Sequence, residues 1–223
     1  ARVDAAPGAT VPGEAPLLWI VPAESGEVQA EAAASVDPEH VRPDLAEVLE
    51  RHGIGLDRNR PEAVARRHDK GKRTARENLA DLVDPGSYVE YAPLVVAPQR
   101  RRRSLDDLIR NTPADGMIAG VGHVNGNLFD EDASRAVIMS YDYTVLAGTQ
   151  GGQNHRKKDR LFEIARHNRL PVVFFTEGGG GRPGDTDGLG VAGLDCLAFQ
   201  YWAMLSGLVP LVGITTGYCF AGN

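Results

Sequence analysis

The chain has 223 residues, of which 42% are hydrophobic and 24% are charged, a composition sufficient for one substantial core. Its formal net charge of −6 argues against general binding to nucleic acid or to anionic membranes. No apolar run reaches the roughly 20 residues that span a bilayer, and no secretory signal is visible. Cys196 and Cys219 lie in apolar segments, which is typical of buried free thiols in a reducing compartment. We therefore expect a cytoplasmic protein.

Two short regions precede the main body of the chain. Residues 1–24 place apolar residues on both sides of a Pro12-Gly13 turn and predict a β-hairpin. Two strands alone are not stable in water, so this hairpin needs a partner structure. Residues 25–43 are rich in Ala, Glu and Pro and lack apolar periodicity, which indicates a linker.

Three short helices and a strand are expected next. The helices begin near Asp44, at Pro61 and after Thr74, where Glu77 occupies the capping-box position. A strand follows at residues 87–91. The polar faces of the helices are basic, which indicates either a solvated face or a contact with a phosphate or a partner. These basic residues are Arg66, Arg67, Lys70, Lys72 and Arg73.

From about residue 115 the pattern alternates between strands and helices. Strands are expected at residues 117–124, 135–141, 171–175 and 209–214, the first two joined through an Asn125-Gly126 turn and an acidic loop. Helices are expected at residues 152–168 and 191–205. This succession predicts a layered α/β core.

The first segment that could carry chemistry is the glycine-rich stretch that follows the third of these strands. Four successive glycines, Gly178 to Gly181, allow close approach of a ligand, and their backbone amides could face a developing negative charge. A flexible surface loop is the alternative. Arg182 could hold an anion or brace the loop through a salt bridge. The stretch matches neither GxxxxGK[ST] nor GxGxxG in its proper context.

Other candidates are single residues and one basic run. Asp142 is either an acid or base, or the cap of a turn. Lys158 either meets a phosphate or lies in solvent. His155 has no Cys or His ligand nearby, so no metal site is expected. Residues 100–103, all arginine and followed by a helix capped at Ser104, suit either a polyanion or a surface or subunit contact.

No Ser-His-Asp order, HExxH motif or CxxC pair is present. The residues alone therefore lead to an α/β protein whose glycine-rich strand ends suit ligand binding or oxyanion stabilisation.

Several ordered motifs extend this interpretation. Residues 71–90, GKRTARENLADLVDPGSYVE, resemble the GKLTARERI…LLDPGSFVE segment of biotin-dependent carboxyltransferases. Asp115-Gly116 with residues 120–122 resembles the strand pair DG…G-G of that family, and residues 142–148 with His155 and Lys158 resemble DFTVxGG and HxEK. Residues 177–182, EGGGGR, lie where the family has DSGGAR, and residues 217–223, GYCFAGN, where it has GPCAGGA. The resemblance covers about residues 60–223.

The resemblance implies a crotonase-like α/β fold of repeated β-β-α units, here truncated and preceded by helices and a remnant hairpin. It implies transfer of a carboxyl group from carboxybiotin to the α carbon of an acyl-CoA. The backbone amides of Ala221 and Gly222 would form an oxyanion hole for the thioester enolate. Decarboxylated biotin itself would take the proton, so no side-chain base is required. The remaining implied substrate-binding residues are Gly179, Gly180, Gly181, Arg182, Phe220 and Lys158.

Three departures from the family pattern bear on the predicted site. Glu177 replaces Asp, Gly178 replaces Ser, and Phe220-Ala221 replaces Ala-Gly. The last change narrows the loop and leaves the acyl-chain preference undefined, although an alanine amide can still donate a hydrogen bond.

Residues 1–24 resemble the closing hairpin of a biotinyl or lipoyl carrier domain, without the Met-Lys pair that bears biotin. Residues 44–223 would then be the N-terminal half of a carboxyltransferase domain in a single-chain carboxylase, after a linker at 25–43. The implied partners are acyl-CoA, a biotin carrier domain with biotin on a lysine outside this chain, and the C-terminal carboxyltransferase half of a neighbouring subunit in a homo-oligomer. We expect this chain alone to be inactive.

Two other classes of function stay open. One is a crotonase-fold acyl-CoA decarboxylase subunit or a hydratase, and a hydratase would need carboxylates beside the oxyanion hole, where Glu177 is the one candidate. The other is a non-catalytic assembly module that keeps the fold without the chemistry.

Overall fold

The computed structural model describes residues 2–6, 8–16, 18–19, 37, 39–188, 197–221 and 223. It divides into two compact units, Ala1–Val41 and Arg42–Asn223. In the first unit, β1 (Arg2–Val3) pairs antiparallel with β2 (Leu18–Trp19), the pairing that a hairpin requires. Residues 25–36 and 38 of the expected linker lie outside those described. Assignment of the hairpin to a carrier domain stays a prediction.

The helices expected early in the second unit are confirmed. They are α1 (Pro43–Ile54), α2 (Pro61–His68) and α3 (Ala75–Leu82). Thr74 and Glu77 form the predicted capping box at the start of α3: the Thr74 hydroxyl accepts from the Glu77 amide at 3.1 Å, and the Glu77 carboxylate accepts from the Thr74 amide at 2.7 Å. Ser104 caps α4 (Leu105–Asn111) in the expected way.

Five strands form one mixed sheet in the order β3-β4-β5-β6-β7. Pairing is antiparallel from β3 to β5 and parallel from β5 to β7. The strands are β3 (Val89–Glu90), β4 (Met117–His123), β5 (Arg135–Tyr141), β6 (Val172–Phe175) and β7 (Leu211–Ile214). The short helix α5 (Glu131–Ser134) lies in the acidic loop before β5. The α/β prediction is confirmed.

Two helices follow strands of the sheet, as expected. The helix α6 (Gly152–Asn168) connects β5 to β6 with the predicted bounds, and α7 (Ala198–Leu205) precedes β7. Residues 191–196 of the second predicted helix lie outside the described residues.

The two faces of the sheet bury alternate residues of each strand, which is the period-two pattern of a strand. Met117, Met139 and Phe174 face α6 and α7 and pack in one buried cluster with Phe162 and Leu205. The other face packs against α3 through a second cluster. That cluster consists of Ala75, Leu79, Ile118, Ala136, Ile138 and Phe175. Burying each large side chain contributes about 1.5–3 kcal/mol.

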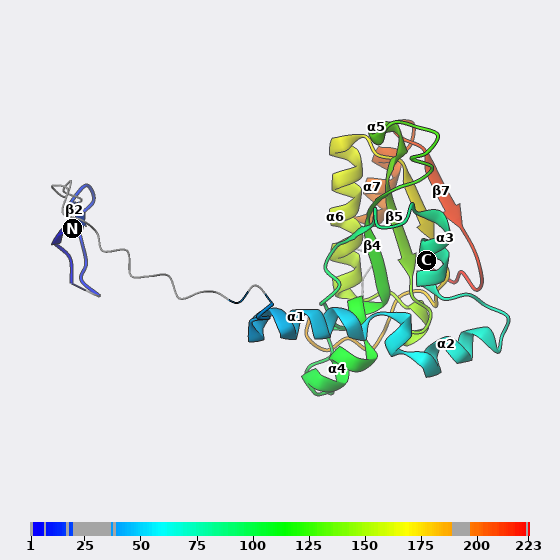
Figure 1. The fold of residues 1–223 in the computed structure, drawn as a ribbon, viewed down its shortest axis with the longest axis horizontal. Coiled ribbons are helices and arrows are strands. Elements are labelled where there is room, and N and C mark those ends of the chain that lie inside the picture. Colours follow the sequence, from blue (N-terminus) through cyan, green and yellow to red (C-terminus); the bar gives the residue numbers. More distant parts are fainter. Residues whose placement is uncertain are drawn as a thin grey trace. The chain divides into compact units, whose positions relative to one another are not determined.

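Because β5, β6 and β7 are parallel, their carboxyl ends lie at one end of the sheet. Helices α1, α2 and α4 gather at this end (Figure 1). The segments that leave the three strands there, residues 142–150, 176–182 and 215–223, are called here the strand-end cluster. None of the helices built from described residues is long and apolar enough to cross a bilayer.

Candidate functional site

Backbone hydrogen bonds hold the strand-end cluster together, so the structure unites three of the predicted segments. The Gln150 amide donates to the Gly180 carbonyl at 2.8 Å, and the Arg182 amide donates to the Gln150 carbonyl at 2.8 Å. On the other side, the Gly178 amide donates to the Tyr218 carbonyl at 2.7 Å, and the Phe220 amide donates to the Gly178 carbonyl at 3.1 Å.

The glycines of the cluster allow this close approach. A Cβ on Gly178 would lie 1.8 Å from Asn223 Nδ2, and Gly180, at φ +79°, would place one 2.8 Å from the Ala221 Cβ. Gly178 and Gly180 are buried, so the interpretation of this stretch as a flexible surface loop is wrong. The amides of Gly178, Gly179 and Gly180 all donate within the protein, and an oxyanion would therefore be met by other donors.

Ala221 is one of the two residues predicted to supply such a donor. Its backbone is left-handed, with φ 53°, and the residue is exposed. Within the described part of the chain its amide donates no hydrogen bond. Gly222, the other predicted oxyanion donor, lies outside the described residues. The roles of both amides stay predictions.

Two large side chains lie close to Ala221 in the sequence. Tyr218 and Phe220 are 78% and 69% exposed. Cys219, between them, is a free and exposed thiol, so the expectation of a buried thiol is wrong there. Cys196 lies outside the described residues.

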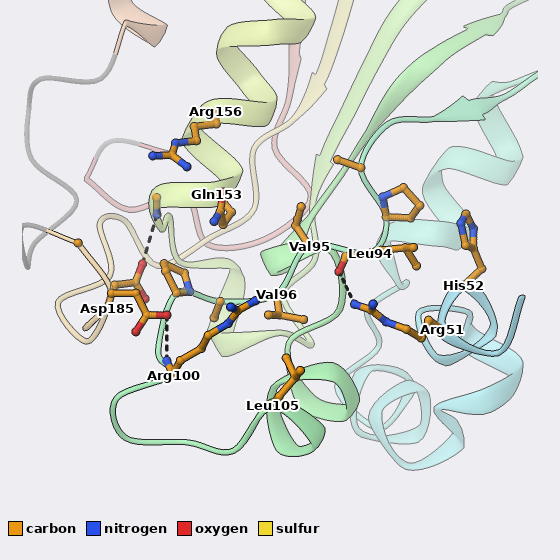
Figure 2. Close-up of a pocket in the computed structure, with 17 residues that line it drawn as sticks. Arg51, His52, Leu94, Val95, Val96, Arg100, Leu105, Gln153, Arg156 and Asp185 are labelled. Atoms are coloured by element: carbon orange, nitrogen blue, oxygen red, sulfur yellow. Dashed lines mark hydrogen bonds between the residues drawn. The ribbon is translucent and has the colours of Figure 1, made fainter. Parts of the chain in front are cut away.

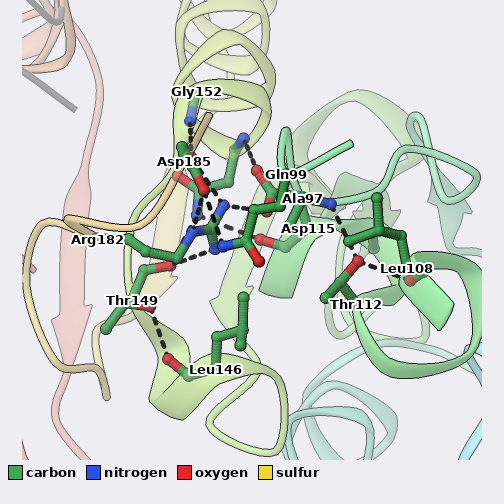
Figure 3. A network of polar contacts seen from close by, with 12 residues as sticks. Ala97, Gln99, Leu108, Thr112, Asp115, Leu146, Thr149, Gly152, Arg182 and Asp185 are labelled. Atoms are coloured by element: carbon green, nitrogen blue, oxygen red, sulfur yellow. Dashed lines mark hydrogen bonds and ion pairs between the residues drawn. The ribbon is translucent and has the colours of Figure 1, made fainter. Parts of the chain in front are cut away.

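Arg182 braces the glycine-rich segment against the rest of the fold (Figure 3). Its guanidinium donates to Asp185 Oδ1 at 2.7 Å and to Asp115 Oδ1 at 2.5 Å, and its side chain is 5% exposed. The same carboxylates accept from backbone amides at the start of α6: Asp115 from Asn154 at 3.0 Å and Asp185 from Gly152 at 3.2 Å. These contacts favour the bracing interpretation, and substrate contact by Arg182 stays a prediction.

Arg182 and its carboxylate partners shift one another's pKa values. Burial raises the pKa of the Asp115 carboxyl above its ordinary value, and the charge and hydrogen bond of Arg182 oppose that rise. Burial alone would lower the pKa of the Arg182 guanidinium, but its hydrogen bonds and charge interactions with Asp185 and Asp115 outweigh burial and raise it. Asp115 and Asp185 lie at the N-terminus of α6, where the partial positive charge of the helix stabilises the ionised form of both carboxylates.

Glu177 forms a second buried ion pair at the site. The Arg67 guanidinium donates to Glu177 Oε2 at 2.6 Å and to Oε1 at 3.1 Å, and both side chains are less than a tenth exposed. Arg67 also lies over the Tyr143 ring, 5.1 Å from its centroid. The interpretation of the basic helix faces as solvated is therefore wrong for Arg67, and the Glu177 carboxylate is held by a partner rather than free for acid–base work.

Asp142 is the turn cap that the sequence favoured. Its Oδ1 accepts from the Thr144 amide at 2.9 Å, and its Oδ2 accepts from Arg60 at 3.1 Å. Because both oxygens are engaged, no acid–base role is needed to explain this carboxylate. Among the described residues, no three His, Cys, Asp or Glu side chains form a group that could hold a metal ion.

Lys158 lies inside the protein, so its interpretation as a solvent-exposed lysine is wrong. Its ammonium donates to the Tyr141 hydroxyl at 2.9 Å and to Gln150 Oε1 at 2.5 Å. The neighbouring Lys157 is also buried and donates to the carbonyls of Ala114 and Met117. Burial lowers the pKa of the Lys157 amine to about 8. Contact between Lys158 and substrate stays a prediction.

A cavity of about 770 Å³ lies beside the Arg182 network and shares Gly152 and Asp185 with it (Figure 2). Residues 92–98, which belong to no helix or strand, form one wall, and the start of α6 forms another. Three arginines line it: Arg51 at the end of α1, Arg100 and Arg156. Arg51 donates to the Leu94 carbonyl at 2.9 Å, whereas the exposed Arg100 and Arg156 form no ion pair with a described residue through their guanidinium groups.

Of the four arginines in the predicted run 100–103, Arg100 alone is among the residues that line the cavity. Arg100 lines it, whereas Arg103 forms an ion pair with Asp107. Sequence analysis missed Arg51 and Arg156 because isolated basic residues on helices carry no signal of a shared pocket.

Residues 66–223 match the carboxyl transferase domain family. The chain belongs to this family. A carboxyl transferase relative, the propionyl-CoA carboxylase beta chain of Saccharopolyspora erythraea, is 31% identical over 180 residues, 80% of this chain and 30% of the relative. The biotin-dependent long chain acyl-coenzyme A carboxylase beta4 subunit of Mycobacterium tuberculosis is 32% identical over 180 residues, 80% of this chain and 31% of the relative.

Solved carboxyl transferase structures share the fold. A single-chain, multi-domain long-chain acyl-CoA carboxylase aligns with a TM-score of 0.77 at 60% identity, covering 82% of this chain and 18% of that one. The transcarboxylase 12S hexamer with bound methylmalonyl-coenzyme A aligns with a TM-score of 0.62 at 29% identity, covering 82% and 34%. The fold is therefore crotonase-like, and the chain spans about a third of the length of the curated relatives it matches.

Proposed function

We propose that this chain is the acyl-CoA-binding half of a carboxyltransferase, working within a biotin-dependent acyl-CoA carboxylase. The observation that carries the proposal is Ala221, an exposed residue with a left-handed backbone that lies against Gly180 of the glycine-rich turn and whose amide donates no hydrogen bond to a described residue. Membership of the carboxyl transferase family supports it.

The chemistry requires stabilisation of negative charge more than it requires a base. Removing a proton from the α carbon of a thioester puts charge on the carbonyl oxygen, and one well-placed donor stabilises such charge by about 3 kcal/mol. The Ala221 and Gly222 amides would supply these donors. Biotin, carried on a lysine outside this chain, would release the carboxyl group that it carries, and the decarboxylated biotin would accept the proton of the α carbon. The carboxylates of Glu177 and Asp142 are engaged by arginines, which disfavours a hydratase.

The arginine-lined cavity suits the phosphates of coenzyme A. Arg100 and Arg156 are exposed, and planar guanidinium groups bind phosphates with paired hydrogen bonds. We assign the phosphate end of acyl-CoA to this cavity and its thioester end to the strand-end cluster.

The relatives of this chain support two proposed partners, a biotin carrier domain and a neighbouring subunit. We propose that the hairpin of residues 1–24 ends a biotin carrier domain, and the likeness of this chain to a single-chain, multi-domain long-chain acyl-CoA carboxylase supports this proposal. A neighbouring subunit of a cytoplasmic homo-oligomer would provide the other carboxyltransferase half, and a relative of this chain forms a hexamer.

The deciding experiment measures transfer of labelled carboxyl from carboxybiotin to a panel of acyl-CoA thioesters, catalysed by the full-length gene product. We expect transfer to one chain-length class and none by residues 1–223 alone. Binding of coenzyme A without transfer would instead favour a decarboxylase subunit or an assembly module.

Phe220→Ala tests which residue sets the acyl preference. Because Phe220 is 69% exposed beside the Ala221 amide, its removal should enlarge the acyl site without weakening the core. We expect the ratio of kcat/KM values for longer over shorter thioesters to rise about 10-fold or more. The free energy of unfolding should change by less than about 0.5 kcal/mol.

Leu128→Ala is the matched control, because Leu128 is 70% exposed on the loop between β4 and β5. It should change neither the ratio nor the stability. An unchanged ratio in Phe220→Ala would remove Phe220 from the acyl site.

A further inference from the structure

The Asn223 side chain links all three segments of the strand-end cluster. Its Oδ1 accepts from the Gly180 amide at 2.6 Å and from Gln150 Nε2 at 3.2 Å. Its Nδ2 donates to the Gly148 carbonyl at 3.1 Å. One side-chain amide therefore fixes the glycine-rich turn, the segment after β5 and the segment that carries Ala221.

The space that Asn223 occupies exists because residue 178 has no side chain. A Cβ on Gly178 would lie 1.8 Å from Asn223 Nδ2 and 2.4 Å from the Gly148 oxygen. A side chain at residue 178 would therefore collide both with the Asn223 side chain and with the carbonyl that this side chain holds. The family motifs DSGGAR and GPCAGGA carry the opposite assignment, with Ser where this chain has Gly178 and Ala where it has Asn223.

A buried lysine anchors this arrangement to the core. The Lys158 ammonium donates to Gln150 Oε1 at 2.5 Å, and Gln150 in turn donates to Asn223. Such chains of hydrogen bonds polarise one another in a low-dielectric interior. The Gly180 peptide, which lies against Ala221, is thereby tied to helix α6.

We propose that Asn223 is a positioning residue, which uses the space left by Gly178 to hold the Ala221 amide in place for the thioester oxygen. This inference rests on the proposed carboxyl transfer. Asn223 acts through the backbone of its neighbours, so its loss should affect the rate of the chemical step more than substrate affinity.

The test is a double-mutant cycle in the full-length gene product, with Asn223→Ala, Gly178→Ser and the double variant. Asn223→Ala should lower kcat about 10- to 100-fold, within the range seen when one oxyanion donor is lost, with KM for acyl-CoA within about 3-fold. Gly178→Ser should lower both kcat and the melting temperature. The double variant should recover at least about 10-fold in kcat over Gly178→Ser. It lacks the clash with Asn223, and the Gly148 carbonyl, which Asn223 Nδ2 no longer holds, can move away from the new side chain.

Gly213→Ser is the control for adding a serine, since nothing lies within 4 Å of a Cβ there and Gly213, in β7, belongs neither to the arginine-lined cavity nor to the strand-end cluster; it should change neither kcat nor melting temperature. A double variant whose kcat equals the product of the two single effects would overturn the inference, as would a KM increase equal to the loss in kcat. If the unmutated enzyme transfers no carboxyl, the proposed function fails. The coupling between residues 178 and 223 is then tested by melting temperatures alone. Additive shifts in the double variant would contradict the coupling, and non-additive shifts would support it.

Discussion

Replacing Arg67 by methionine is expected to lower the free energy of unfolding by about 3–5 kcal/mol. The change leaves the Glu177 carboxylate buried, only 7% exposed, without its counter-charge. It also removes the contact of the guanidinium with the Tyr143 ring and its hydrogen bonds to the Arg73 carbonyl. Urea unfolding of the chain measures the effect.

The adjacent Arg66 provides the control. It pairs with Glu62 at 3.9 Å, and the two side chains are 67% and 92% exposed. Exposed pairs contribute about 0–1 kcal/mol, so Arg66→Met should change stability little. Equal losses in both variants would show that the burial of the Arg67–Glu177 pair has no energetic consequence.

Local patterns were sufficient to predict most helices and strands of this fold. The bounds of α6 and the capping box at Thr74 and Glu77 follow from periodicity and from residues three positions apart. The family resemblance added the crotonase-like fold, which spacing alone did not provide, because the order of strands in a sheet depends on contacts between distant residues.

The ion pairs of the site could not be predicted in this way. Arg67 and Glu177 are 110 residues apart, and a basic residue on a helix is usually solvated. Solvent exposure was one of the two alternatives for Lys158 for the same reason, although its amine ends inside the protein against Tyr141 and Gln150. Residue type indicates a preference for water, and only the packed fold shows which charges have partners.

The pairing of Gly178 with Asn223 illustrates a similar limit. Both departures from the family motifs are visible in the sequence, 45 positions apart, but nothing local connects them. The connection becomes visible when β6 and β7 lie side by side and their following segments meet. Gly178 and Asn223, two separate departures in the sequence, are therefore one structural change at the site.

Replacing Arg182 by methionine should destabilise the chain by about 3–5 kcal/mol near pH 7, and by less at lower pH. Asp115 and Asp185, whose side chains are 0% and 7% exposed, would lose the counter-charge that they share. Burial already raises the pKa of Asp115, and Arg182 opposes that rise. Without Arg182 the pKa of Asp115 in the folded state rises further above its unfolded value.

The folded variant then binds a proton more readily than its unfolded chain, so its stability increases relative to the parent as the pH falls from 7 towards 5. Unfolding by urea at several pH values, for the parent, Arg182→Met and Arg160→Met, measures this difference. Arg160 is 68% exposed and pairs with Glu163 at 3.3 Å, so its variant should show a small deficit that hardly depends on pH. A deficit in Arg182→Met that stays constant from pH 7 to pH 5 would mean that the buried carboxylates keep their charge without Arg182, held by the amides at the start of α6 alone.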